Sequence, residues 1–312
     1  MATFFRIYNN VLTSAGETKR LGFEKQNAVG IPDEYLNGRE FVVMRTCHGI
    51  GDWCIISAMP RLLKEKFPDC KVYIPSGKML KKVFGQYLNN WGYGLYDASL
   101  VTEDVFAHNP FVDSYVDEMN GEIFHDHYRI YDSNQSKIPL VEQMLKFWQF
   151  TEAEIKDSTP DIFYSPNEIE EGERLVQEYT GTNKFGYLSL TSTFGNTSEG
   201  EELVRKLKEF SYIDKWFYYG EVPLDSIPIN FLKNVVEVKK LQLPLRMQMY
   251  LKTKAEVNIG NESGTNLWCA KYSKSYVLSH KRYGKIHGEH LVNKPRKDPF
   301  KSGNFVRQIN YI

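Results

Sequence analysis

Two short stretches of this sequence combine glycines with polar side chains at the point where an apolar run ends. In the first, HGIGDW (48–53), Gly49 and Gly51 precede Asp52 and follow the run FVVM. Glycines let a backbone turn sharply and let another molecule approach it closely. A carboxylate held at such a turn can act as a general base that takes a proton from a hydroxyl. Asp52 is therefore a candidate catalytic base, with His48, Gly49 and Gly51 in the loop around it.

The same residues have a simpler interpretation, in which Asp52 only caps a helix. Aspartate is among the residues preferred at a helix N-cap. The glycine fingerprint of dinucleotide-binding folds is also incomplete, because Cys54 stands where its third glycine belongs. Taken alone, this stretch favours capping over catalysis.

The second stretch is VNIGNESGTNLWCAKY (257–272), in which an apolar run leads through Asn261, Glu262, Ser263 and Gly264 into a helical pattern. Backbone N–H groups at a helix start can hold a phosphate. Glu262 or Ser263 could take the hydroxyls of a ribose or another sugar. The alternative is again a capped turn between a strand and a helix.

Apolar runs and helical spacings alternate along the chain, which indicates parallel sheets with crossover helices. In WCIISAMPRLLKEKF (53–67) the apolar residues recur every three or four positions, and Pro60 is expected to bend that helix. The expected strands are 41–46, 71–75, 184–190, 215–220, 234–238 and 255–260, and the other expected helices are 78–88, 140–150, 167–180, 199–210, 244–252 and 265–272.

A polar stretch with two prolines, TEAEIKDSTPDIFYSP (151–166), predicts a hinge. Ser165, Pro166 and Glu168 have the residue types of an N-cap, a first-turn proline and a capping carboxylate. We place a domain boundary near residue 158, giving domains 1–158, with an N-terminal extension 1–40, and 159–312, with a basic C-terminal tail. The prediction is an α/β protein with two Rossmann-like domains whose parallel sheets face an interdomain cleft, where such folds bind ligands.

Composition narrows the classes of function. No uncharged stretch is long enough to span a bilayer, and the N-terminus lacks the pattern of a secretory signal, so a cytoplasmic location is expected. Lys and Arg (39) balance Asp and Glu (39), which gives no overall attraction to nucleic acid. The four cysteines are too scattered for a disulfide framework and are expected to be buried or idle thiols.

A metal site is not expected. No two aspartates lie two residues apart, as in the Asp-x-Asp pair of metal-dependent sugar transferases. The motif His-Asp-His at 125–127 has metal-binding residue types, but it has no evident partner cluster and suits a surface or acceptor site better.

HGIGDWCIISAMPRLLKEKFPDCKVYI resembles the opening of glycosyltransferase family 9, the ADP-heptose:lipopolysaccharide heptosyltransferase group. NPFVDSYV, LSLTSTFG, FYYGE and LQLPLRMQMYLKTKAEVNIGNESGTNLWCA resemble later landmarks of that family in the same order, so the resemblance covers about residues 41 to 280. It implies a GT-B fold and a metal-independent, inverting sugar transfer. No cofactor is implied beyond a nucleotide-diphosphate sugar as co-substrate.

The resemblance also implies roles for individual residues. Asp52 would deprotonate the acceptor hydroxyl. The implied donor-binding residues are Thr191, Ser192 and Thr193 at the diphosphate, and Gly220, Glu221, Asn261, Glu262, Ser263 and Gly264 at the nucleoside and sugar. The sequence departs from the family pattern in two places. TSTFGNTSEG (191–200) has no basic residue to offset the diphosphate charge, and Leu267 stands where the family has a histidine, which weakens a heptose assignment.

Three interpretations stay open at this point. The first is a glycosyltransferase with a glycan or other hydroxyl-bearing acceptor. The second keeps the reaction but takes hydroxylated bases of DNA as acceptor, which neutral net charge disfavours. The third is a non-catalytic module of the same fold that binds a nucleotide or sugar.

Overall fold

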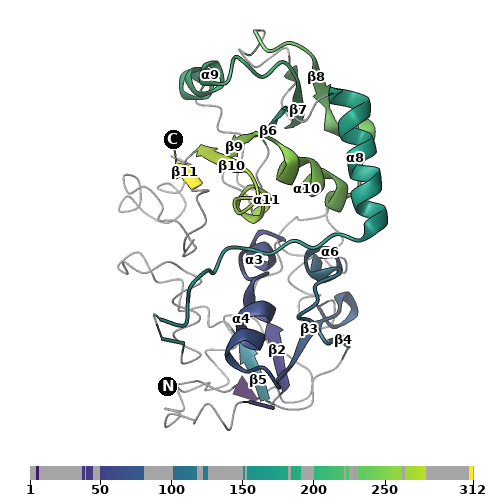
Figure 1. The fold of residues 1–312 in the computed structure, drawn as a ribbon, viewed down its shortest axis with the longest axis vertical. Coiled ribbons are helices and arrows are strands. Elements are labelled where there is room, and N and C mark those ends of the chain that lie inside the picture. Colours follow the sequence, from purple (N-terminus) through teal and green to yellow (C-terminus); the bar gives the residue numbers. More distant parts are fainter. Residues whose placement is uncertain are drawn as a thin grey trace, which may run out of the picture. The chain divides into compact units, whose positions relative to one another are not determined.

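The computed structural model describes residues 5–6, 37–38, 40–44, 50–80, 101–117, 122–125, 150–151, 153–181, 184–190, 200–220, 223–224, 229, 231–261, 264–278 and 309–311. The chain divides into two compact units (Figure 1). Unit 1 comprises Met1–Phe163 and Asp298–Asn304, and unit 2 comprises Tyr164–Lys297 and Phe305–Ile312. Most of the predicted N-terminal extension, nearly all of the helix 140–150 and most of the basic tail lie outside the described residues.

Unit 1 is built on a five-stranded sheet in the order β1-β5-β2-β3-β4. Its strands are β1 (Phe5–Arg6), β2 (Glu40–Met44), β3 (Lys71–Pro75), β4 (Ser114–Val116) and β5 (Glu122–His125). The pairings of β2 with β3 and β5, and of β3 with β4, are parallel. Only β1 is antiparallel among these described strands, at the edge beside β5. Strand β3 has the predicted bounds, and β2 confirms the predicted strand as far as Met44.

The single bent helix predicted over 53–67 is wrong, because the chain forms two helices there. They are α3 (Ile50–Ile55) and α4 (Met59–Lys66), and three-residue turn hydrogen bonds such as Met59 N to Ile56 O join them. Pro60 lies in the first turn of α4. A proline has no N–H to donate, which is harmless at a helix start and disruptive within a helix.

The apolar faces of these helices form the core of unit 1 with the sheet. Phe41 of β2 stacks on Phe67 after α4, with ring centroids 5.6 Å apart. Trp53 of α3 packs edge-on against Phe106 of α6 (Val101–Phe106) at 6.3 Å. All four rings are at most 1% exposed. The contact of α3 with α6 therefore fixes the helix that carries Asp52.

The stretch predicted as a hinge packs against unit 1 over part of its length. Ile155, Ser158 and Asp161 are buried. The Asp161 amide donates to Ser57 Oγ at 3.0 Å, and Arg61 of α4 donates through Nε to Asp161 Oδ2 at 2.7 Å. Asp161 thus anchors this stretch to Ser57 and to Arg61 of α4.

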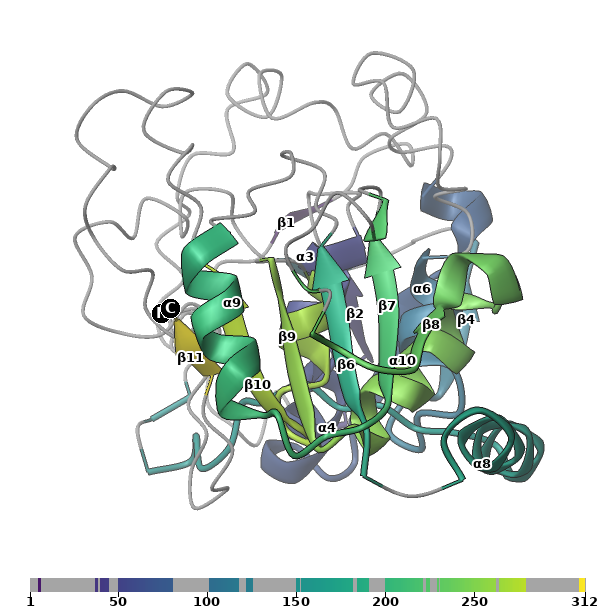
Figure 2. The ribbon, with the colours of Figure 1, turned by 90° about the horizontal axis from the view of Figure 1, so that it is seen from above.

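Unit 2 is a six-stranded sheet in the order β11-β10-β9-β6-β7-β8, and all its pairings are parallel (Figure 2). The strands are β6 (Gly186–Leu190), β7 (Trp216–Gly220), β8 (Val235–Glu237), β9 (Val257–Asn261), β10 (Lys274–Leu278) and β11 (Ile309–Tyr311). Counted along the chain within this unit, the order is 3-2-1-4-5-6, that of a doubly wound Rossmann fold.

Helices cover both faces of this sheet. On one face α9 (Gly200–Glu209) places Leu203 and Leu207 against Leu188 and Ile259, and Figure 2 shows α9 in front of the strands. On the other face α8 (Pro166–Thr180) and α10 (Leu245–Lys254) pack on residues that include Phe185, Tyr187 and Phe217. The short helices are η5 (Val238–Leu241), a 3-10 helix, and α11 (Gly264–Trp268).

The start of α8 confirms the predicted capping box. Ser165 is the N-cap and accepts from the Glu168 amide, while the Glu168 carboxylate accepts from the Ser165 amide at 2.8 Å. Strands β1, β4, β5, β10 and β11 and the helices α6 and η5 were not predicted. Within the described residues, every helix is too short or too polar to cross a membrane.

Candidate functional site

The carboxyl ends of three neighbouring strands in unit 2 carry the predicted donor motifs. Leu190 of β6 lies opposite Gly220 of β7, and Ser189 lies opposite Gly260 of β9. The sheet winds in opposite directions from β6 and β9, so their carboxyl ends form the topological switch point at which such folds bind ligands. Stretches 191–199, 221–222 and 262–263, which hold most of the predicted donor residues, follow these three strand ends in the chain.

Asn261, the last residue of β9, lies at this switch point with an unsatisfied side chain. It is 1% exposed, and neither Oδ1 nor Nδ2 has a hydrogen-bond partner among the residues that the structure describes. Side chains alternate along a strand, so Asn261 is on the same face as Ile259, the face that α9 covers. Buried amides are nearly always hydrogen-bonded, so this amide calls for a partner outside the described residues.

The strand ends meet closely because residue 260 is a glycine. A Cβ atom on Gly260 would lie 2.1 Å from the main-chain oxygen of Ser189 and 2.8 Å from Asn266 Nδ2. A larger residue would push β9 and α11 away from β6. The glycine in NIGNESG therefore has a packing role within the sheet.

A network of buried hydrogen bonds connects α10 with α11 and with the end of β9. Asn266 Nδ2 donates to the Asn261 carbonyl at 2.6 Å. Lys252 Nζ donates to Asn266 Oδ1 at 2.7 Å and to Thr265 Oγ1 at 3.1 Å. The ammonium also lies 5.1 Å from the centre of the Tyr187 ring. Sequence patterns did not identify Lys252, because its spacing in α10 is that of an ordinary core position.

Two neighbouring groups of this network stay neutral. Burial raises the pKa of the Tyr187 hydroxyl and of the Cys269 thiol. Cys54, Cys70 and Cys269 are all buried thiols outside any disulfide, which confirms the expectation for these three cysteines. Cys47 lies outside the described residues.

Unit 1 has its own switch point, between β2 and β5. Met44 at the end of β2 lies opposite His125 at the end of β5, while the chain passes from β2 to β3 on the other side. His125 is the first residue of the His-Asp-His motif, and the loop with His48 follows β2 in the chain. The ends of β2 and β5, which lead into these two motifs, are thus neighbours although about 80 residues separate them in the chain.

Asp52 is the third residue of α3, in the first turn of the helix that starts at Ile50. Gly51 precedes it in the same helix. The side chain of Asp52 is outside the part of the structure that is described, as are residues His48 and Gly49. Asp52 is therefore not the N-cap of α3, although a carboxylate in the first turn also stabilises a helix start.

The donor-binding predictions fall into two groups. Gly220, Asn261 and Gly264 are described, and all three lie at the carboxyl edge of the unit 2 sheet or directly after it. Thr191, Ser192, Thr193, Glu221, Glu262 and Ser263 lie outside the described residues. Leu267, at the position of the family's histidine, is 5% exposed.

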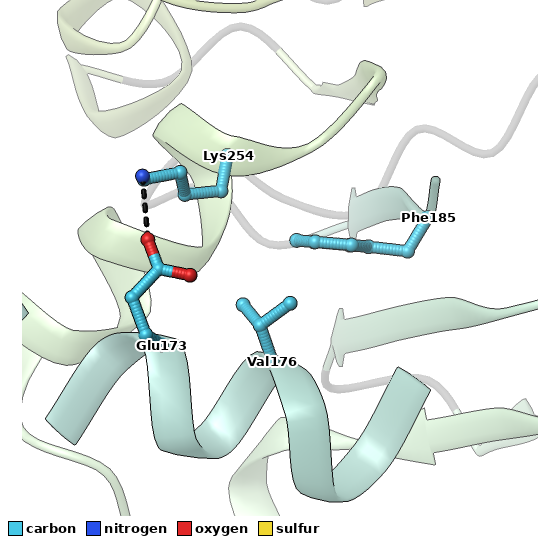
Figure 3. A pocket seen from close by; sticks show the side chains of 4 residues that line it. All are labelled: Glu173, Val176, Phe185 and Lys254. Carbon is cyan, nitrogen blue, oxygen red and sulfur yellow. Dashed lines mark hydrogen bonds and ion pairs between the residues drawn. The ribbon is translucent and has the colours of Figure 1, made fainter. Parts of the chain in front are cut away.

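A separate pocket of about 180 Å³ lies elsewhere in unit 2. Glu173, Val176, Phe185 and Lys254 line it, and Glu173 forms an ion pair with Lys254 at 2.6 Å (Figure 3). Phe185 directly precedes β6, so this pocket is at the amino edge of the sheet, away from the switch point. Among the described residues, no group of three or more His, Cys, Asp or Glu side chains could hold a metal ion.

Comparison with solved structures identifies the class of fold. The chain superposes on the glycosyl transferase family 9 structure from Veillonella parvula with a TM-score of 0.52 and 10% identity, covering 77% of this chain and 80% of that one. This likeness confirms the predicted resemblance at the level of the fold, a GT-B type chain with two Rossmann-like units.

Two Escherichia coli proteins give lower scores. ADP-heptose LPS heptosyltransferase II matches with a TM-score of 0.46 and 12% identity, covering 88% of this chain and 92% of its own. Heptosyltransferase WaaC, in a structure with ADP-2-deoxy-2-fluoro heptose, matches with a TM-score of 0.41 and 10% identity, covering 77% and 88%. No family model matches the sequence, and no curated protein matches it.

Proposed function

We propose that this protein is a glycosyltransferase that transfers a sugar from a nucleotide-diphosphate donor to an acceptor hydroxyl. In this proposal unit 2 binds the donor at the carboxyl ends of β6, β7 and β9, and unit 1 binds the acceptor near Asp52. The transfer inverts the anomeric centre and uses no metal. The likeness of the fold to a family 9 glycosyl transferase supports this reaction class.

The observation that carries the proposal is the buried amide of Asn261 at the switch point of unit 2, which has no hydrogen-bond partner among the described residues. A buried amide without partners costs free energy, roughly 1–3 kcal/mol. A ligand with both donors and acceptors, such as a sugar or a nucleoside, would satisfy it. The motif residues that follow β6, β7 and β9 add hydroxyl and carboxylate groups from the same edge.

Asp52 would act as the general base. Its carboxylate takes the proton of the acceptor hydroxyl while that oxygen attacks the anomeric carbon. The bond from this carbon to the diphosphate breaks on the opposite side, and the nucleoside diphosphate leaves. Base catalysis contributes about a hundred- to ten-thousand-fold in rate, and stabilisation of the departing diphosphate contributes a comparable factor.

Release of nucleoside diphosphate from a panel of nucleotide sugars, with and without glycan acceptors, tests the proposal. Asp52→Asn should lower turnover by at least about a hundredfold while nucleotide binding is kept. Asp69→Asn is a matched control in unit 1, because Asp69 pairs with Asn37 after α4 and should leave turnover unchanged. Equal turnover in wild type and Asp52→Asn would remove Asp52 from the mechanism.

The same assay separates the enzyme from a non-catalytic module. A binding module would take up a nucleotide sugar without ever releasing the nucleoside diphosphate. Even slow hydrolysis without an acceptor, abolished by Asp52→Asn, would support the enzyme.

A further inference from the structure

Lys252 is a buried cation in the last turn of α10. Its side chain is 3% exposed, in a helix whose neighbouring residues Met249 and Leu251 are core residues. An ammonium group is costly to bury, and an apolar residue of the same length would fit such a position at lower cost. A lysine here therefore calls for a role that depends on its charge or its hydrogen bonds.

The contacts of Lys252 lead to the end of β9. Its Nζ donates to Asn266 Oδ1 at 2.7 Å, which leaves the Asn266 amide nitrogen to donate to the Asn261 carbonyl at 2.6 Å. A charged donor at one end of an amide polarises it and strengthens the hydrogen bond at the other end. A third bond, from Nζ to Thr265 Oγ1 at 3.1 Å, fixes the start of α11 in the same way.

These bonds hold the two described segments that flank residues 262–263, the end of β9 and the start of α11. Asn261 is the last residue of β9, and Thr265 and Asn266 follow in α11. Asn266 Nδ2 is already 2.6 Å from the Asn261 carbonyl, so Asn266 cannot move closer to the end of β9. The link between the end of β9 and the start of α11 thus depends on Asn266, and the orientation of Asn266 depends on Lys252.

We propose that Lys252 is a positioning residue of the donor site, which fixes the end of β9 relative to the start of α11 and supplies a fixed positive charge there for the diphosphate. This inference rests on the proposed function. It also supplies a basic group to a site whose TSTFGNTSEG stretch has none. In a poorly solvated interior, a charge acts on a nearby anion more strongly than it would in water.

The test compares a nucleoside diphosphate with its own nucleoside as ligands. ADP, GDP, UDP and CDP are titrated calorimetrically into wild type, and the tightest binder and its nucleoside are then titrated into Lys252→Met. Loss of a charge-assisted interaction weakens binding about tenfold to a hundredfold. We expect that loss for the diphosphate and less than about threefold for the nucleoside.

Lys254→Met is the matched control on the same helix. Lys254 pairs with Glu173 at the opposite edge of the sheet, so both ligands should bind as to wild type. Asn266→Asp is a second variant in case Lys252→Met does not fold. An aspartate keeps a partner for the ammonium, but it offsets the charge and cannot donate to Asn261, so the same selective loss of diphosphate binding is expected.

Two results would overturn the inference. Equal weakening of diphosphate and nucleoside in both variants would show a purely structural role, and unchanged diphosphate binding would show no role in the site. In either case wild type still binds the nucleotide, and the proposed function stands. If wild type binds none of the four diphosphates, the proposed function itself fails and this inference with it.

Discussion

Gly260 of β9 lies so close to β6 that a Cβ atom on it would stand 2.1 Å from the main-chain oxygen of Ser189. This contact joins the two strands whose carboxyl ends form the switch point of unit 2. Because the obstructing atom belongs to the main chain of a central strand, a small rotation of a side chain cannot relieve the clash.

Gly260→Ala should therefore destabilise the protein by about 3 kcal/mol or more, as severe overpacking does. Urea unfolding followed by circular dichroism measures the change. Gly181→Ala serves as a control. Gly181 has φ 57° with nothing within 4 Å of an added Cβ, so only the left-handed backbone is penalised, by about 1–2 kcal/mol. Equal effects of the two substitutions would contradict the close approach of β9 to β6.

The second prediction concerns the polar residues before α8. Arg61 is largely buried and binds Asp161 at 2.7 Å, with Asp157 at 3.8 Å. Removing one partner of a buried ion pair leaves the other charge uncompensated, so Arg61→Met should cost about 3–5 kcal/mol in the free energy of unfolding.

Arg174→Met provides the comparison for Arg61. Arg174 also pairs with two carboxylates, Glu171 and Glu178, but on an exposed face of α8. Exposed pairs contribute about 1 kcal/mol or less. Similar losses in the two variants would mean that residues 157–161 are not packed on α4 in solution.

The third prediction is a pH dependence that comes from Asp113 in the landmark NPFVDSYV. Burial opposes ionisation of Asp113, but hydrogen bonds from Lys64 and from the Val72 amide, each at 2.7 Å, outweigh it and hold the pKa below its usual range. A carboxyl group with a lowered pKa in the folded state adds stability above its unfolded pKa, near 4, and loses that stability as the pH falls through the folded value.

Asp113→Asn should thus be about 2 kcal/mol less stable than wild type at pH 7, and the gap should shrink as the pH falls from about 5 to about 2. Unfolding curves of both proteins across this range give the difference directly. A gap that is constant with pH would show that the charge of Asp113 contributes nothing.

Much of the fold could be predicted where local sequence decides the structure. Ser165, Pro166 and Glu168 start α8 as predicted, since all their capping contacts lie within one turn. The strands of unit 2 from β6 to β9 also appear close to their predicted positions, because continuous apolar runs are typical of buried parallel strands.

Other features depend on partners distant in sequence and could not be predicted. Strand β11 has three residues and exists by pairing with β10, which ends about 30 residues earlier. Lys252 has an ordinary core spacing, and its role emerges only when α11 folds back beside α10. For the candidate site, the motifs could be found in the sequence. Which motifs follow neighbouring strands at the same edge of the sheet depends on the strand order, which the sequence does not show.

The central claim is that a nucleotide sugar binds at the switch point of unit 2 and satisfies the amide of Asn261. Asn261→Leu keeps the size of the side chain and removes its polar atoms. Thermal unfolding with and without each nucleotide sugar of a panel tests the claim most directly, since a ligand of the native state raises Tm. We predict that Asn261→Leu without ligand is at least as stable as wild type, because an unsatisfied buried amide is removed, and that it binds the nucleotide sugar about tenfold more weakly. Binding of equal strength in the variant and wild type, or no shift of wild type by any nucleotide sugar, would contradict the account.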